Sequence, residues 1–307
     1  MKFKKPVSRF LFGLACLVIV LGAGFVWVGA VIPTWNATDE EIALALPGDE
    51  LVPQPQLDWN HGMTIQAPAE EIYPWLIQMG DTRGAYYSYT FIENVFMMVG
   101  KMEDRYVNAD RIHPEWQNPP IGQGMIADMF ALQGYQEGEY VLAGATEALN
   151  EMGMHWTWLW YLRPVDQDTT RLIVRHRFVF PEDAPQGAME AVLNAGYVME
   201  RGMMLGIRNR AEGRALPGPI EPLEVALWLA ALACGLISAV RYVRKPGRLH
   251  PLGIGLEAVV VLFIFTFIQP AIWVRVVLLL ILIGSVLIDY YPGRVTQWVR
   301  GRFPKKM

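Results

Sequence analysis

The chain has 307 residues, of which 53% are hydrophobic, and a formal net charge of −4. This apolar content is high for a soluble protein, and the mean hydropathy of +0.22 agrees with it. The two cysteines, Cys16 and Cys234, both fall in long apolar runs, which excludes a fold held by disulfides and a cysteine-ligated metal site.

The N-terminus predicts a membrane anchor. Basic residues are concentrated in 1–10, ahead of an uninterrupted apolar run over 11–32 that is long enough to cross a bilayer. A cleaved signal peptide is the alternative, but the run is longer than a signal core usually is, which favours a retained transmembrane helix. The stretch 33–55 that follows is rich in acids and prolines and is typical of a linker.

A strand and two helices are predicted next. Residues 59–66 alternate apolar and polar side chains, as a half-buried strand does. From 68 to 80 the apolar residues recur at helical spacing, and Gly80 suits the end of a helix. Pro74 removes one backbone hydrogen bond from this helix. A second apolar helix is expected over 87–99.

The sequence of these two helices resembles a known family. It reads APAEEIYPWLIQMG over 67–80 and RGAYYSYTFIEN over 83–94. This is similar to the start of SRPBCC (START-like, polyketide cyclase-like) domains that are fused to bacterial membrane segments, and the resemblance covers about 46–214. The matching positions are Pro74, Trp75, Leu76, Gln78, Met79, Gly80, Arg83, Gly84, Tyr87, Ser88, Tyr89, Glu93 and Asn94.

Other positions depart from the family pattern. Thr90 stands where the relatives carry an acid, which weakens any mechanism that needs a carboxylate there. The remaining departures are Tyr73, Ala85, Tyr86 and Phe91. The resemblance implies a helix-grip fold and says little about activity, because this fold hosts many functions.

The rest of the domain is predicted as antiparallel strands and one long helix. Strands are expected over 121–130 and 139–143, and the alternation over 155–162 and 171–180 predicts an antiparallel hairpin. A helix is expected over 188–214, with an inward face made of Met189, Val192, Leu193, Gly196, Met199, Met203 and Ile207. The order of elements predicts an α+β domain over 33–218, in which a curved antiparallel sheet wraps around a long C-terminal helix.

Three further transmembrane helices are predicted after the domain, over 223–240, 252–268 and 272–288. Glu257 and Arg275 fall inside two of these runs. We expect both side chains to extend toward the nearer membrane face, and an intramembrane functional site is the alternative.

Charge predicts how the chain crosses the membrane. The 1–10 segment, the 241–250 loop and the 289–307 tail are basic, and basic segments mark the cytoplasmic side. We therefore expect four spans in a bacterial plasma membrane, with both termini in the cytoplasm and the 33–218 domain outside it. Residues 33–220 carry 12 basic and 26 acidic residues, which argues against binding to nucleic acid.

Polar side chains near the predicted turns are candidates for catalytic chemistry: Asp81, Arg83, Asp110 and His113. Such groups can transfer protons when they are buried with shifted pKa values. The alternative is that Arg83 and Glu93 hold loops by ion pairs and backbone contacts. The histidines of the domain show no metal-ligand spacing, and no nucleotide-binding glycine loop or serine nucleophile motif occurs, so neither a metal nor a cofactor is expected.

Methionine and aromatic side chains are predicted to face the space between the sheet and the long helix. They suit an adaptable apolar pocket, and they suit an ordinary packed core equally well. The resemblance favours a pocket, since relatives of this fold often keep one. The predicted ligand-binding residues are Trp75, Met79, Tyr87, Tyr89, Trp156, Trp158, His176, Met199 and Met203.

Two alternatives concern the last strand of the sheet. His176 is expected on the inner face, where it either touches a ligand or is a hydrogen-bonded core histidine. Arg175 and Arg177 are expected to pair with strand acids on the solvent face.

The sequence therefore predicts a membrane-tethered domain that binds a hydrophobic small molecule or a lipid. Two alternatives remain open. One is a cyclase- or isomerase-type enzyme that uses Tyr, Asp and Arg groups at the pocket mouth, and the other is a structural or sensory partner of another membrane protein. The binding module is favoured over the enzyme, because no catalytic motif is present.

Overall fold

The computed structural model describes residues 6–99, 107–126, 129–214, 220–245 and 248–291. Backbone contacts divide the chain into two compact units. One unit is formed by 28–217 and contains a β-sheet. The other is formed by 1–27 together with 218–307 and contains long apolar helices.

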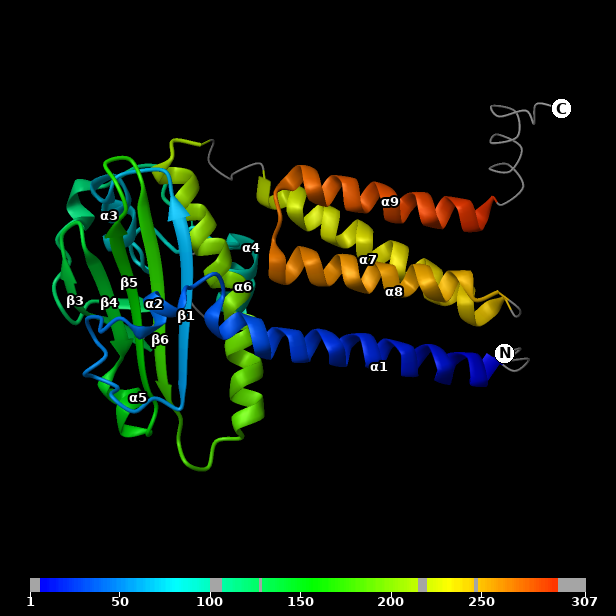
Figure 1. The fold of residues 1–307 in the computed structure, drawn as a ribbon, viewed down its shortest axis with the longest axis horizontal. Coiled ribbons are helices and arrows are strands. Elements are labelled where there is room, and N and C mark those ends of the chain that lie inside the picture. Colours follow the sequence, from blue (N-terminus) through cyan, green and yellow to red (C-terminus); the bar gives the residue numbers. More distant parts are fainter. Residues whose placement is uncertain (1–5, 100–106, 127–128, 215–219, 246–247, 292–307) are drawn as a thin grey trace. The chain divides into compact units, whose positions relative to one another are not determined.

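A six-stranded antiparallel sheet is the framework of the 28–217 unit (Figure 1). Its strands lie in the order β1-β6-β5-β4-β3-β2, so that the first and last strands of the chain are neighbours. The register of β5 and β6 pairs Trp158 with His176, which confirms the predicted hairpin. The strands are β1 (Leu57–Ile65), β2 (Gly124–Ile126), β3 (Phe130–Gln136), β4 (Tyr140–Ala145), β5 (His155–Pro164) and β6 (Thr170–Val179).

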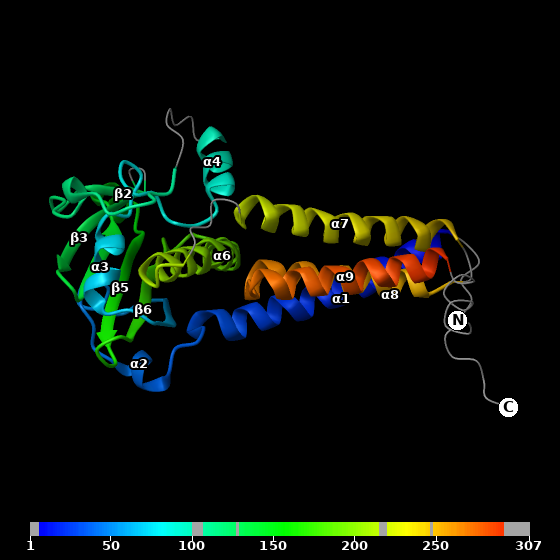
Figure 2. The same ribbon diagram turned by 90° about the horizontal axis from the view of Figure 1, so that it is seen from above.

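Helices α3 (Ala69–Ile77) and α6 (Gln186–Ala211) cover one face of this sheet (Figures 1 and 2). Pro74 lies inside α3, as expected, and Glu70 and Glu71 occupy its first turn. The second predicted helix begins later than expected, as α4 (Thr90–Val99). Short helices connect the larger elements: η1 (Ile32–Thr34), α2 (Asp39–Ala43), η2 (Pro114–Trp116) and α5 (Glu147–Glu151).

The main core lies between the sheet and these two helices. Each large apolar side chain that is fully buried there contributes about 1.5–3 kcal/mol relative to exposure. The result is an α+β domain with a sheet packed around a long C-terminal helix, as the sequence predicts. Core side chains include Met63, Ile65, Ile72, Leu76, Trp158, Trp160, Leu172, Val174, Met203, Met204 and Ile207.

Two sequence expectations about these elements are wrong in detail. Val192 was expected on the inward face of α6, but it is 65% exposed. The buried face is instead shifted, and it includes Tyr197 and Glu200. The single strand expected over 121–130 is two strands, because β2 ends at Ile126 and β3 begins at Phe130.

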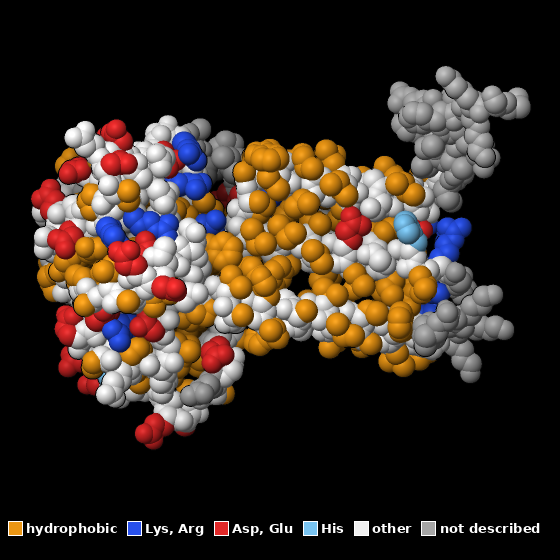
Figure 3. Space-filling view, viewed as in Figure 1, with side chains coloured by type: hydrophobic (Ala, Val, Ile, Leu, Met, Phe, Trp, Pro, Cys, Tyr) orange, Lys and Arg blue, Asp and Glu red, His pale blue; other side chains and the backbone are white. Residues whose placement is uncertain are grey.

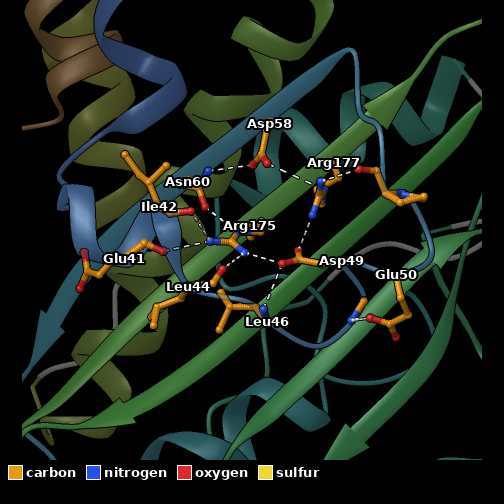
Figure 4. A network of polar contacts seen from close by, with 12 residues as sticks. Glu41, Ile42, Leu44, Leu46, Asp49, Glu50, Asp58, Asn60, Arg175 and Arg177 are labelled. Carbon is orange, nitrogen blue, oxygen red and sulfur yellow. Dashed lines mark hydrogen bonds and ion pairs between the residues drawn. The ribbon is translucent and has the colours of Figure 1, made fainter.

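The acidic stretch that resembled a linker is an ordered segment that covers the opposite face of the sheet (Figure 4). Thr38 caps α2 by accepting from the backbone N–H of Glu41, whose carboxylate accepts from the N–H of Thr38 in return. Leu46 then packs against a small apolar cluster of the outer sheet face, formed by Leu142, Leu159 and Ile173. We call residues 38–53 the lead-in segment.

The lead-in segment also buries Arg175, which corrects the expectation that this side chain faces solvent. Arg175 is 3% exposed and donates five hydrogen bonds. Its neighbour Arg177 pairs with Asp49 at 3.1 Å and with the strand acid Asp58 at 3.8 Å. The acceptors of Arg175 are Asn60 Oδ1, Asp49 Oδ2 and the carbonyl oxygens of Glu41, Ile42 and Leu44 (Figure 4).

In the described residues of the other unit, four helical segments are long and apolar enough to cross a membrane. Figure 3 shows hydrophobic side chains over much of their visible surface. This agrees with the four apolar runs of the sequence. The elements are α1 (Pro6–Val31), α7 (Ile220–Arg244), α8 (His250–Phe263) with the π-helical turn η3 (Ile264–Ile268), and α9 (Ile272–Tyr290).

Arg275 and Glu257, the two charged residues that fall inside predicted spans, both have hydrogen-bond or ion-pair partners within this unit. Arg275 is only 4% exposed, and it pairs with Glu224 at 3.0 Å while donating to the Pro270 carbonyl oxygen at 2.9 Å. It therefore does not extend outward as expected, because α7 supplies the opposite charge. Glu257 accepts a long hydrogen bond of 3.4 Å from Ser285 Oγ.

Candidate functional site

The candidate site is built on the turn that joins α3 to α4. Gly80 and Ala85 close this turn through two backbone hydrogen bonds of 3.1 Å each. Ala85 and Tyr87 have left-handed φ angles of 54° and 58°. Side chains other than glycine adopt that conformation at a cost of about 1–3 kcal/mol, and such strain is concentrated at functional sites.

Two glycines of α6 hold this turn in place. A Cβ atom at Gly206 would lie 2.0 Å from the carbonyl oxygen of Tyr87, and one at Gly202 would lie 2.5 Å from Ser88 Oγ. Ser88 Oγ also donates to the carbonyl oxygen of Met199 at 2.8 Å. The turn therefore rests directly on the helix backbone, and a larger residue at either glycine would displace it.

A cavity of about 550 Å³ opens beside the turn. Its volume is typical of small-molecule sites, which span about 300–1,000 Å³. The four candidates for catalytic chemistry, which lie on two separate segments of the chain, all contribute to its lining. The lining residues are Asp81, Thr82, Arg83, Ala85, Val107, Asn108, Ala109, Asp110, His113 and Trp116.

Arg83 is the buried cation of this cavity, with 7% of the residue exposed. Its Nη2 donates to the carbonyl oxygen of Met79 at 2.6 Å. Its Nε and Nη1 have no hydrogen-bond partner among the described residues. Burial lowers the pKa of the guanidinium, and the nearby Tyr87, Tyr86 and Asp81 only partly offset that effect. A buried donor without a partner costs about 1–3 kcal/mol, so the fold holds this group at the expense of stability.

An aromatic wall stands on the 107–116 segment. The rings of His113 and Trp116 stack with their centroids 4.0 Å apart and their planes 23° apart. The backbone N–H of His113 donates to Gln78 Oε1 at 3.0 Å, which ties the wall to the end of α3. Hydrogen bonds from its own backbone and from His113 lower the pKa of the Glu115 carboxyl.

The acids of the cavity lie nearer to solvent than Arg83 does. Asp81 is half-buried and accepts a hydrogen bond from Tyr86 Oη, which also contacts the carbonyl oxygen of Met125. Asp110 is exposed. The site therefore combines a buried positive charge with an acidic, hydrated rim.

The predicted ligand-binding residues do not line this cavity. Trp75, Met79, Tyr87, Trp158 and Met203 pack against one another and their neighbours in the main core. Burial raises the pKa of Tyr87 well above its usual value. Their role toward a ligand stays a prediction. Three further members of the set, Tyr89, Trp156 and Met199, are partly exposed. The last member, His176, is buried elsewhere in the domain.

His176 belongs to a buried polar cluster that the sequence analysis missed. Glu200 of α6 bridges His61 Nδ1 and His176 Nε2 with its two carboxylate oxygens. His61 Nε2 donates to the Ile32 carbonyl oxygen at 2.9 Å, and Trp156 Nε1 donates to His176 Nδ1 at 2.9 Å. Glu200 therefore links β1 to β6 through both of its carboxylate oxygens.

Both ring nitrogens of His176 have hydrogen-bond partners, as the core-histidine alternative expects, and contact with a ligand stays a prediction. Burial raises the pKa of Glu200, but the charges and hydrogen bonds of the two histidines outweigh it and hold that pKa far below its usual range. The sequence signal was only positional: Glu200 lies midway between Leu193 and Ile207, which are both buried on the same helix. Among the residues that the structure describes, no group of three or more His, Cys, Asp or Glu side chains is placed to hold a metal ion.

Neither a family model nor a curated protein matches this chain. Similar solved structures include truncated norcoclaurine synthase from Thalictrum flavum, at 12% identity and a TM-score of 0.28, covering 50% of this chain and 91% of that one. The di-domain aromatase/cyclase BexL from the BE-7585A biosynthetic pathway is 17% identical with a TM-score of 0.29, and the match covers 54% of each chain. The Zhui aromatase/cyclase from Streptomyces sp. R1128 is 14% identical with a TM-score of 0.21, covering 51% of this chain and 91% of that one. At these values the similarities carry no argument about function.

Proposed function

We propose that residues 33–218 form a membrane-tethered, SRPBCC-like domain that binds a hydrophobic small molecule or lipid in the cavity beside the α3–α4 turn. One observation carries the proposal. The cavity of about 550 Å³ has buried apolar walls at Ala85 and Ala109, and its aromatic wall at Trp116 packs onto the main core. The strained turn beside it fits a binding site, and the sequence resemblance agrees with this function.

Binding can be measured on the full chain held in lipid nanodiscs. Equilibrium dialysis with 2-naphthamide and 2-naphthoate, corrected with empty nanodiscs, is expected to show that at least one of the two binds. Thr82 is an exposed lining residue, so Thr82→Trp should block the cavity without disturbing the core. Gln167→Trp, in the exposed β5–β6 turn, is the matched control and should bind as the wild type does. Binding of neither probe, or binding that survives Thr82→Trp, would count against the proposed cavity.

A cyclase- or isomerase-type enzyme is the second candidate function. It is favoured by the meeting of Asp81, Arg83, Asp110 and His113 at one cavity. A carboxylate or imidazole there could take a proton next to a carbonyl group, while the guanidinium stabilises the resulting enolate.

Deuterium exchange into the methyl group of 2-acetonaphthone tests this enzymatic role. Enzyme chemistry predicts exchange above the rate in empty nanodiscs, and it predicts that Asp110→Asn removes the excess. A pure binding module predicts bound ketone with no excess exchange.

The orientation in the membrane is part of the proposal. Basic segments flank the predicted spans on one side, so we place both termini in the cytoplasm and the 33–218 domain outside it. A reporter that is active only outside the cytoplasm should work when it is fused after residue 218 and fail after residue 247. The opposite result would reverse the topology.

A further inference from the structure

Arg83 differs from the other buried arginines of the 28–217 unit in what it contacts. Arg175 donates five hydrogen bonds. Arg210 donates to the carbonyl oxygens of Ala109 and Gly206 and lies over the Tyr87 ring at 4.4 Å. Arg83 donates to one carbonyl oxygen and forms no ion pair with a described residue. Its Nε and Nη1 are buried and have no hydrogen-bond partner in the described part of the fold, and the residue lines the cavity, so their donor capacity is open to a ligand.

We propose that Arg83 binds an oxyanion carried by the ligand, such as a carboxylate or an enolate on an apolar body. This inference rests on the proposed function, because it assigns the class of ligand to the same cavity. Ionised acceptors form the strongest hydrogen bonds with a guanidinium, and a buried guanidinium gains more from them than an exposed one does.

The geometry around Arg83 fixes the cation in advance of binding. Gly80 has a φ of 135°, and a Cβ atom there would lie 3.0 Å from Arg83 Nη2. The glycine therefore lets the guanidinium lie against the backbone of the turn, where the Met79 carbonyl oxygen anchors Nη2. Little conformational freedom remains to be lost when a ligand arrives.

Asp81 and Asp110, the acids on the cavity rim, influence which anionic ligands the cavity can bind. Asp81 already accepts from Tyr86, and Asp110 is exposed, so water and salt screen both charges better than they screen Arg83. An anion held at the rim would meet two like charges. A ligand with a single oxyanion that reaches Arg83 past an apolar wall avoids most of that repulsion.

The test compares a matched pair of probes on the full chain in nanodiscs at neutral pH. 2-Naphthoate and 2-naphthamide have nearly the same shape, and only the former is charged. We expect the wild type to bind 2-naphthoate about 10- to 100-fold more tightly, as charge-assisted hydrogen bonds imply. Arg83→Gln should reduce that ratio to near one, and Arg83→Lys should restore part of it. Arg111→Gln removes an exposed charge from the neighbouring segment, outside the cavity lining, and should leave the ratio unchanged.

The possible outcomes separate this inference from the proposed function. If neither probe binds, the proposed function fails and the inference fails with it. If both bind the wild type equally well, the cavity is a binding site but the oxyanion assignment is wrong. A preference for 2-naphthoate that survives Arg83→Gln and disappears in Arg111→Gln would also overturn the assignment. If an Arg83 variant does not fold, the wild-type comparison still decides whether the cavity prefers an oxyanion, and a preference of about one overturns the assignment.

Discussion

Two regions of the domain each bury an arginine, and the two arginines differ in how many hydrogen bonds they form. Under the lead-in segment, Arg175 is 3% exposed and each of its guanidinium nitrogens has an acceptor. In the cavity, Arg83 is 7% exposed, and two of its three nitrogens have no partner among the described residues. Nearly equal burial therefore accompanies very different degrees of hydrogen bonding.

The difference separates a structural charge from one that is available for binding. A buried cation that is fully bonded joins elements together, and its loss leaves several acceptors unpaired. A buried cation that is under-bonded lowers stability and keeps its capacity for a ligand. Burial alone would have placed both residues in the same class.

The largest expected effect is that of Arg175→Met. It removes the guanidinium from Asn60 and the lead-in carbonyls and leaves Asp49 with Arg177 as its remaining ion-pair partner, so the free energy of unfolding should fall by about 3–5 kcal/mol. Urea titration of the nanodisc-held chain, read by pulse proteolysis, measures this loss. A loss below about 1 kcal/mol would show that the bonds of Arg175 contribute little to stability.

Glu200→Gln tests a third buried charge, which is fully paired like Arg175. At neutral pH the variant should lose about 2–3 kcal/mol, since the two buried histidine rings lose the carboxylate that bonds to both of them. The pKa of Glu200 is depressed in the folded state, so its stabilisation is present above the ordinary value of 4.5 and is lost as pH falls toward the folded value. The gap between wild type and variant should therefore shrink below about pH 4.5, and a constant gap in the same urea titration would contradict this.

Gly206→Ala tests the frame that holds the Arg83 turn. The added methyl group would meet the Tyr87 carbonyl oxygen at 2.0 Å, so we expect a loss of about 1–3 kcal/mol. Naphthoate binding should weaken as well, because the turn must shift. Gly187→Ala, which meets no atom within 4 Å on the same helix, is the control and should leave binding unchanged. Equal effects of the two substitutions would exclude the contact as the cause.

The smallest expected effect on stability is that of Arg83→Met. One hydrogen bond to Met79 is lost, but an under-bonded charge is removed from the interior, so stability should change by less than about 1 kcal/mol. The comparison with Arg175→Met in the same urea titration is the sharpest check. A loss as large as that of Arg175→Met would place Arg83 among the structural charges.

The elements that follow one simple periodicity could be predicted from the sequence. The alternation in β5 and β6 gave the correct hairpin, and the four apolar runs gave the long helices. The inward face of α6 was predicted in part: Leu193, Met203 and Ile207 are buried as expected, whereas Val192 is exposed and Glu200 is buried. An apolar pattern assigns an acid to the outside, and only the two histidines on other strands make its burial favourable.

The residues of the candidate site could be predicted from the sequence, but their hydrogen bonds could not. Arg83 and its three acidic or basic companions were identified from their positions near turns, and they do meet at one cavity. Whether an arginine is satisfied depends on carbonyl oxygens and distant side chains, which no sequence period encodes. The same reason explains why Arg175 was expected on the surface: most of its acceptors are backbone atoms of a segment that resembled a linker.

The lead-in segment has a consequence for how the domain can be divided. Its carbonyl groups and Asp49 behave as an intramolecular ligand of the outer sheet face, held at high effective concentration by the short connection to β1. A chain that began after Pro53 would be a receptor that lacks this ligand. A peptide covering 38–53 should then bind to it in trans, and an Asp49→Asn peptide should bind less well. The lead-in segment therefore acts as a separate binding partner of the sheet, and a free peptide of the same sequence could replace it.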